Sequence, residues 1–237
     1  MAFRRGPKIV TDGLVFAVDA ADEQSYIGSG TSWNTIMKNV NFTLSGTPTY
    51  ETANGGGLVF DGVDDYAQHA NDPTFNSVNE FTFNFWVKYG GEVDSVTLIG
   101  KPRAGWADAL RIGYTLSSTT LFYNLSGTTR CSNTSVTLST TEFTNICFVQ
   151  NPSESSNPDK TKFYINGAAI SNESSGYALT SAEAPTFPLI IGGWRQGNSG
   201  VYLEWDGNMN IAQMYNKALS ASEVLQNYNT LKGRFGL

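Results

Sequence analysis

The feature that most constrains this sequence is the strict alternation of apolar and polar side chains in short runs. The clearest run is FTFNFWVKY (81–89), in which Phe81, Phe83 and Phe85 occupy every second position. A period of two is typical of a half-buried β-strand and does not fit a helix. Because Trp86 interrupts the more polar side, we expect both faces of this strand to be covered.

Many further runs share this character. They are rich in aromatic and β-branched residues, are separated by Gly, Asn and Ser, and span 13–20, 57–60, 65–70, 96–101, 109–116, 120–125, 145–151, 162–167, 189–194 and 209–216. So many short strands without intervening helices predict an all-β fold, a two-sheet antiparallel jelly-roll β-sandwich. With no internal repeat and no visible second boundary, residues 13–237 are expected to form one domain.

One short helix is expected near the C-terminus. Ser220 and Glu223 have the spacing of a capping box, in which each side chain accepts from the other's backbone N–H. Apolar residues then recur at helical spacing: Val224, Leu225, Tyr228 and Leu231. Gly233 is the expected end of this helix, in a left-handed conformation.

Three Asx-Gly pairs predict tight hairpin turns: Asp61-Gly62, Asn166-Gly167 and Asp206-Gly207. Type I′ turns need positive φ at both central residues, which these pairs tolerate well. In LVFDGVDDY (58–66), Phe60 and Val63 would then face each other across the turn. Asp64 and Asp65 would follow on opposite faces of the outgoing strand.

The first twelve residues precede any clear strand and are expected to form an extended basic arm. It contains Arg4, Arg5 and Lys8. Two interpretations stay open: the arm docks on an acidic neighbour in an assembly, or it is a solvated chain end.

The charge balance argues against a nucleic-acid partner. The chain holds 21 acidic and 15 basic residues, a net charge of −6, whereas a phosphate backbone requires a concentrated basic face. No apolar run approaches the roughly 20 residues that cross a bilayer, and no Sec-type signal is visible at the N-terminus. Neither nucleic acid nor membrane is expected as a partner.

The two cysteines, Cys131 and Cys147, are too few for a disulfide scaffold. With His69 as the single histidine, a zinc centre and cysteine catalysis are both disfavoured. Cys147 alternates with Ile146 and Phe148, which favours a buried thiol, and a disulfide between the two cysteines is the alternative.

Several segments together resemble a known family. These are GLVFDGVDDYAQ, FTFNFWVK, KFYINGAAI, LIIGG and GNMNIAQMYNKALSASEVLQNY, in that order over about residues 13–233. They are similar to the concanavalin A-like, laminin-G-like jelly-roll domains. The opening RRGPKIVTDGLVFAVDAADEQSYIGSGTSW further resembles structural proteins of marine tailed phages. The resemblance implies a sandwich of two antiparallel sheets in a virion component.

Glucanases of this superfamily suggest a test for catalysis. Their retaining members carry Glu-x-Asp-x-Glu or Glu-x-Asp-x-x-Glu on one strand, which supplies a nucleophile and an acid/base. Here Glu92 and Asp94 are followed by Val96 and Thr97 at the third position, so the acid/base is missing. We therefore expect no enzymatic activity, with a glycoside hydrolase as the least favoured alternative.

Calcium is the inorganic ligand that the resemblance implies for some members. Asp61 and Asp64, with Asp206 from a distant segment, are the candidate ligands, since calcium requires about six to eight oxygen atoms. Because Asp64 and Asp65 are expected to diverge, we predict no cofactor, and calcium stays open as the alternative.

A ligand or interface site is expected in two loop-rich segments. Residues 192–208 and 103–108 gather the candidates Trp106, Trp194, Arg195, Asn198, Tyr202 and Trp205. These residue types suit sugar stacking, and they are also enriched in protein interfaces.

The phage resemblance favours the interface. The expected function is a non-catalytic virion structural or decoration protein of the capsid, neck or tail. It would assemble in the host cytoplasm and pack in a symmetric array with other virion proteins. A lectin-like module for host-surface or environmental glycans is the alternative.

Overall fold

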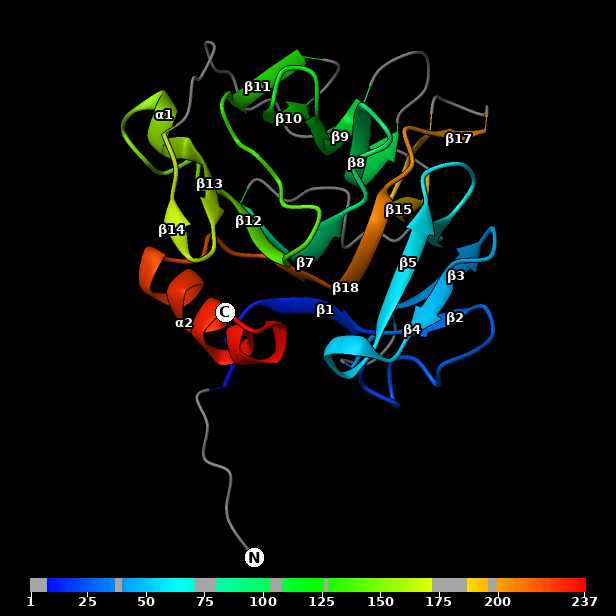
Figure 1. Cartoon of the computed structure of the whole chain (residues 1–237). Helices are drawn as coiled ribbons and strands as arrows, with labels where there is room; N and C mark the ends of the chain where they lie inside the picture. The colour runs from blue at the N-terminus through cyan, green and yellow to red at the C-terminus, as the bar shows by residue number, and fades with distance from the viewer. Residues whose placement is uncertain are drawn as a thin grey trace, which may run out of the picture.

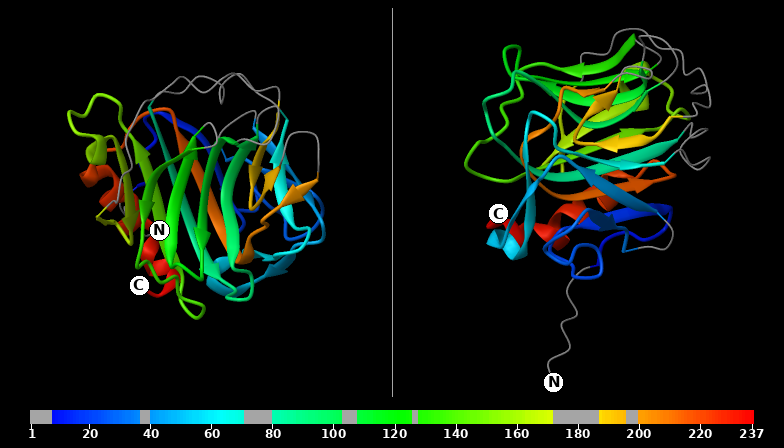
Figure 2. Two further views of the ribbon diagram at one scale, coloured as in Figure 1. Left: turned by 90° about the horizontal axis from the view of Figure 1, so that it is seen from above. Right: turned by 90° about the vertical axis from the view of Figure 1, so that its right-hand side faces the viewer.

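In the computed structural model, described residues are 8–36, 40–70, 80–102, 108–125, 128–171, 187–195 and 200–237. These residues form two eight-stranded sheets that pack against each other as layers (Figure 1). Figure 2 shows the layering from above and from the side. The predicted jelly-roll sandwich with one short C-terminal helix is confirmed.

The first layer, sheet A, has the strand order β14-β13-β12-β7-β18-β5-β4, and β1 also pairs with β18. Its strands are β1 (Leu14–Asp19), β4 (Thr49–Glu51), β5 (Gly57–Asp61), β7 (Phe81–Tyr89), β12 (Thr144–Gln150), β13 (Thr161–Ile165), β14 (Ala168–Ala169) and β18 (Asp206–Tyr215). All their pairings are antiparallel.

The second layer, sheet B, has the order β11-β10-β9-β8-β15-β6-β3-β2. Its strands are β2 (Ser32–Asn34), β3 (Asn41–Ser45), β6 (Tyr66–His69), β8 (Ser95–Pro102), β9 (Asp108–Thr115), β10 (Thr120–Leu125), β11 (Thr128–Asn133) and β15 (Leu189–Ile191). A separate two-stranded hairpin is formed by β16 (Trp194–Arg195) and β17 (Val201–Tyr202). The helices are α1 (Asn157–Lys160), α2 (Ala221–Leu231) and the 3-10 turns η1 (Ala53–Gly55) and η3 (Lys232–Phe235).

The core between the sheets is built from the alternating aromatic residues that predicted the strands. The rings of Tyr123 and Phe148 lie 4.5 Å apart, and Phe163 lies 4.9 Å from Phe148. The Tyr123 hydroxyl donates to Gln150 Oε1 at 2.8 Å, so the single polar end of this cluster is satisfied.

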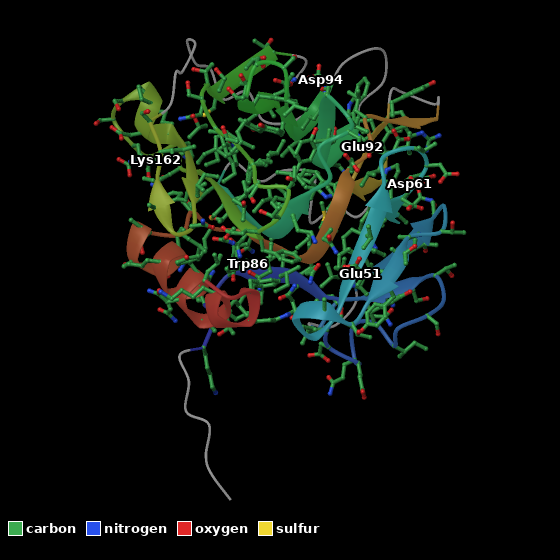
Figure 3. The ribbon with its side chains drawn as sticks, viewed as in Figure 1. Glu51, Asp61, Trp86, Glu92, Asp94 and Lys162 are labelled. Atoms are coloured by element: carbon green, nitrogen blue, oxygen red, sulfur yellow. The ribbon has the colours of Figure 1, made fainter. Side chains whose placement is uncertain are left out.

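The outer face of sheet A is covered by the C-terminal segment. Trp86, on the side of β7 that faces away from the core, is fully buried and stacks on Phe235 with ring centroids 4.3 Å apart. Tyr228 stacks on the same indole at 5.7 Å. Figure 3 shows Trp86 beside the C-terminal helix. The expectation that both faces of this strand are covered is therefore confirmed.

Helix α2 starts as predicted but ends differently. Ser220 and Glu223 form both halves of the capping box. Gly233 does not end the helix, because the chain continues as η3 to bring Phe235 against Trp86, and Gly236 takes the left-handed turn at φ 77°. Leu225 is 46% exposed rather than buried.

Of the three predicted Asx-Gly turns, one forms a hairpin. Asn166-Gly167 joins β13 to β14 with φ of 51° and 78°. The Asp206-Gly207 prediction was wrong, because both residues pair with β5 and β7 inside β18. Gly207 is required there, since a Cβ would lie 2.3 Å from the Lys88 carbonyl oxygen.

No helix among the residues that the structure describes combines the length and apolarity needed to span a bilayer.

Candidate functional site

The outer face of sheet B carries an aromatic residue where a solvent-facing strand position would ordinarily be polar. Along β10, Leu121, Tyr123 and Leu125 are buried toward the core. Phe122 points the opposite way, because side chains alternate along a strand, and it is half-buried.

Phe122 is the first member of a stacked series. The Arg111 guanidinium of β9 lies 4.8 Å from the Phe122 ring centroid and 5.5 Å from that of Trp194. Arg111 Nε also donates to Thr97 Oγ1 of β8 at 3.1 Å. The two rings attract the guanidinium by cation–π interaction, and the hydrogen bond to Thr97 helps to fix its orientation.

Glycines allow this close packing. A Cβ on Gly113 would lie 2.5 Å from Phe122 Cζ, and one on Gly100 would lie 2.8 Å from the Gly193 carbonyl oxygen. The β16–β17 hairpin therefore rests directly on the outer face of sheet B.

Within that hairpin, Trp194 pairs directly with Tyr202. Side chains of directly opposed residues project to the same side of an antiparallel pair, so Tyr202 and Trp194 lie on the same face of the hairpin. Tyr202 is 46% exposed. We call Phe122, Arg111, Trp194 and Tyr202 the aromatic row; it begins on β10 and ends at a ring open to solvent.

Two further candidates, Arg195 and Trp205, lie outside the aromatic row. Arg195 is half-buried and pairs with Val201 at the alternate position of the hairpin. Trp205 was wrongly expected to be a ligand contact: it is fully buried, lies 5.9 Å from the Tyr89 ring, and donates Nε1–H to the Asn208 carbonyl. Trp106, Asn198, Arg4 and Arg5 lie outside the described residues.

A second polar cluster lies in the acidic arch, the segment Asp61–Asp65 that connects β5 in sheet A to β6 in sheet B. Carboxylate oxygens of Asp61, Asp64 and Asp65 lie within 4.8 Å of one another. Asp65 is buried, and its two oxygens accept from Thr47 N at 2.7 Å and Asp61 N at 3.1 Å. Burial raises the pKa of Asp65, the two N–H donors lower it, and the neighbouring Asp61 and Asp64 charges raise it further.

The acidic arch corrects the hairpin prediction. β5 and β6 belong to different sheets, so Phe60 and Val63 do not face each other; Phe60 is buried and Val63 is 72% exposed. Asp61 Oδ1 accepts from Val63 N at 2.9 Å, which makes a wider turn than a two-residue hairpin. Strand β6 begins only at Tyr66, so strand alternation does not separate Asp64 from Asp65, and the expected divergence was wrong.

Asp206 was expected to join these aspartates and does not. Its Oδ2 accepts from Glu92 N at 2.8 Å and Val93 N at 3.3 Å, and these bonds hold the loop before β8. Asn208, two residues further along β18, donates its Nδ2–H to Glu51 Oε2 at 3.0 Å. Glu204 is 8% exposed; burial raises its pKa, and the charges of Asp61 and Asp64 raise it further.

The carboxylates tested for catalysis have structural contacts. Asp94 accepts from the backbone N–H and the hydroxyl of Ser117, at 2.6 and 3.1 Å. Figure 3 shows Glu92 and Asp94 near the start of β8. The chain offers no third carboxylate at position 96 or 97, so the missing acid/base is not replaced locally.

Both cysteines are free and buried, which confirms the buried thiol predicted for Cys147 and excludes the alternative disulfide with Cys131 in this structure. Burial raises the pKa of the Cys131 thiol to about 12, and burial also raises that of Cys147. Neither thiol is suited to nucleophilic chemistry, which requires the thiolate.

A polar groove of about 440 Å³ opens between the segment around α1 and the start of α2. Its lysines are already paired: Lys162 with Asp159 at 2.9 Å, and Lys217 with Asp12 and Glu223 at 2.8 and 2.9 Å. The two Lys217 ion pairs link the N-terminal segment, the loop after β18 and α2.

Comparison with known families agrees with this architecture. Residues 61–225 match the model of the concanavalin A-like lectin/glucanases superfamily. The chain belongs to this superfamily. Among curated proteins, none matches the sequence.

Solved structures of the superfamily's fold superpose on nearly the whole chain. Trypanosoma rangeli sialidase in complex with sialic acid is similar at a TM-score of 0.67 and 16% identity, over 95% of this chain and 34% of the sialidase. Domain 4 of AbnA, an extracellular arabinanase of Geobacillus stearothermophilus, in complex with arabinotriose, is similar at a TM-score of 0.59 and 15% identity. The match covers 91% of this chain and 98% of the arabinanase domain. The binding domain of botulinum neurotoxin serotype D/C is similar at a TM-score of 0.64 and 12% identity. The match covers 92% of this chain and 52% of the neurotoxin chain. This superfamily member therefore spans about a third of the sialidase chain, and at these identities the likeness establishes the fold alone.

Proposed function

We propose that this chain is a non-catalytic, lectin-like carbohydrate-binding module whose glycan contacts the aromatic row on the outer face of sheet B. The observation that carries the proposal is the Arg111 guanidinium packed against the rings of Phe122 and Trp194, with the exposed Tyr202 paired opposite Trp194 in the hairpin. Aromatic faces beside a few placed polar groups suit a sugar ring, which has apolar C–H faces and polar hydroxyl edges.

The rigid placement of the row supports binding. Arg111 is fixed by two rings and Thr97, and Trp194 lies against the backbone at Gly100. Pre-ordered side chains lose little conformational entropy when a ligand docks. We therefore expect that glycan binding at the part of the site formed by β8, β9 and β10 requires little ordering of loops.

The absence of catalysis is part of the proposal. Glu92 and Asp94 lack a third carboxylate partner, and Asp94 is occupied by Ser117. The structural neighbours support a binding role, since they include a domain of an arabinanase in complex with arabinotriose and a toxin binding domain. The activity of the sialidase is not part of the proposal, because this chain covers only about a third of the sialidase chain.

The test is a glycan array probed with the whole chain, followed by affinity measurement for the best glycan. We expect Tyr202→Ala to lower affinity at least about tenfold, a loss of about 1.4 kcal/mol. Leu225→Ala is the matched control, because both side chains are 46% exposed and Leu225 lies on α2. Equal affinities for the two variants would remove the aromatic row from the binding site.

A second role, as a decoration protein of a phage particle, rests on the resemblance of the N-terminal segment. The observation that favours docking by this segment is its fixed starting point: Gln226 Nε2 donates to the Lys8 carbonyl at 2.8 Å, and Asn227 Oδ1 accepts from Val10 N at 2.8 Å. Under this proposal, Arg4, Arg5 and Lys8 contact an acidic surface of another virion protein, and the chain is located in the virion.

Deletion of residues 1–7 tests this second role, because it removes Arg4 and Arg5 and leaves the anchor on α2 intact. We expect lower occupancy of the truncated chain in assembled particles at an unchanged melting temperature. Full occupancy of the truncated chain would reject docking by the arm.

A further inference from the structure

A pocket of about 300 Å³ lies where β4, the last strand of sheet A, approaches the β2–β3 edge of sheet B (Figure 1). Its lining comes from β3, β4, the loop between them and the segment 26–31 before β2. We call it the tyrosine pocket; no residue of the aromatic row lines it. Small-ligand pockets measure roughly 300–1,000 Å³, so this one suits a ligand of one or two rings.

Two tyrosines form the aromatic part of the lining. The rings of Tyr26 and Tyr50 have centroids 5.5 Å apart and are tilted by 49°. Tyr26 is 4% exposed, and its hydroxyl donates to the Gly30 carbonyl at 3.3 Å, whereas Tyr50 is half-buried. Because the rings pack against each other, they form one aromatic wall and leave no space for a cation between them.

The other walls are held by backbone hydrogen bonds. Leu44 N of β3 donates to the Thr31 carbonyl at 2.8 Å, which fixes the segment before β2. Thr47 N donates to the buried Asp65 carboxylate at 2.7 Å, which fixes the loop between β3 and β4. A pocket whose walls are ordered in advance loses little conformational entropy when a ligand enters.

The polar groups of the tyrosine pocket are neutral. Every residue of its described lining is uncharged. Ser29, Thr31 and Thr47 supply hydroxyl groups on exposed residues, and three glycines leave their peptide groups uncovered by side chains. Hydroxyl and peptide groups together both donate and accept, which suits a ligand rich in hydroxyl groups.

The charge behind one wall disfavours an anionic ligand. A Cβ on Gly46 would meet carboxylate oxygens of both Asp64 and Asp65, so these two side chains lie directly against the pocket wall. A ligand with a carboxylate would be repelled at this distance, whereas a neutral ligand would not.

We propose that the tyrosine pocket binds a neutral pyranose unit, with the apolar face of the sugar on the Tyr50 ring and its hydroxyls on Ser29, Thr31 and Thr47. Aromatic side chains beside a few placed polar groups are the features of such a site. It is a second saccharide site on this chain. The saccharide class is shared with the proposed function, but the residues are not.

The test is nuclear magnetic resonance titration of the full-length chain with methyl glycosides of glucose, galactose, mannose and N-acetylglucosamine, and with glucuronate and galacturonate. We expect at least one neutral sugar to shift the backbone amides of residues 28–31 and 46–50 in a saturable way. The uronate of matching stereochemistry should bind at least about tenfold more weakly, because of the charges of Asp64 and Asp65.

Tyr50→Ala should weaken this binding at least about tenfold, because it removes the stacking surface. Tyr202→Ala is the matched control, since it removes a tyrosine of the aromatic row, and it should leave the shifts of these amides unchanged. Ser29→Trp on the exposed loop is a second variant, which should block the pocket at an unchanged melting temperature.

Absence of saturable shifts in residues 28–31 and 46–50 with every neutral sugar would overturn the site. Equal affinity of Tyr50→Ala and Tyr202→Ala at these amides would also overturn it, and equal binding of the uronate would overturn the choice of a neutral ligand. Because the readout is confined to these amides, failure of the tyrosine pocket is distinguishable from failure of the aromatic row.

Discussion

Asn227 illustrates how much a single buried polar residue contributes to this fold. It lies on α2 at a position that helical spacing assigns to the apolar face, and it is 1% exposed. Its Oδ1 accepts from Val10 N, its Nδ2 donates to the Tyr215 hydroxyl at 3.0 Å, and that hydroxyl donates to the Val10 carbonyl at 3.1 Å. The network joins the N-terminal segment, β18 and α2.

Truncation of the Asn227 side chain should therefore destabilise the fold. We expect Asn227→Ala to lower the free energy of unfolding by about 1–3 kcal/mol, because it leaves Val10 N–H and the Tyr215 hydroxyl buried with fewer partners. Urea unfolding measures the change. The exposed Asn229 on the same helix provides the control Asn229→Ala, expected within about 0.5 kcal/mol of the parent chain. Similar losses in both variants would contradict a specific role for the network.

At the same scale, the sequence reveals part of the candidate site. Trp194 and Tyr202 could be singled out as aromatic residues in a loop-rich segment. Arg111 and Phe122 were missed, although both occupy alternate positions on predicted strands, where a large aromatic on the outer face was a usable signal.

At the scale of elements, the longer strands could be predicted because their alternation reflects a core on one side. The predicted run 81–89 coincides with β7, and 120–125 coincides with β10. Strands β2 and β4 were missed, since three residues are too few to establish a period. The acidic arch was taken for a hairpin because local turn chemistry does not reveal whether the next strand joins the same sheet or the opposite one.

Helix α2 allows a prediction on pH. Burial raises the pKa of Glu223, but hydrogen bonds from Lys217 and Ser220 outweigh it and hold the pKa below the usual 4.5. An acid with a lower pKa in the folded chain stabilises the fold above its ordinary pKa, and this stabilisation is lost as pH falls through the folded value. Glu223→Gln keeps a residue that can complete the capping box and removes the charge.

We expect the parent chain to exceed Glu223→Gln in unfolding free energy by a few tenths to about 1 kcal/mol near neutral pH. This difference should shrink below about pH 4.5, where Glu223 begins to be protonated. Urea unfolding of both chains across this range measures it. A difference that stays constant into acid would mean that the ion pair with Lys217 does not stabilise the helix.

At the scale of the whole molecule, the two outer faces of the sandwich are unlike. Sheet A is covered by α2 and η3, which bury Trp86, whereas sheet B carries the β16–β17 hairpin and the exposed Tyr202 (Figure 1). The N-terminal segment is held on the α2 face. This asymmetry is consistent with the proposed division, in which sheet A carries the supporting face and the outer face of sheet B contacts the ligand.

The most direct test of this account is hydrogen exchange of the whole chain with and without the strongest glycan from the array. Binding at the aromatic row predicts slower exchange in β9, β10 and β17 and unchanged exchange in α2. Protection confined to α2, or an array on which no glycan retains the chain, would contradict a carbohydrate-binding role for the outer face of sheet B.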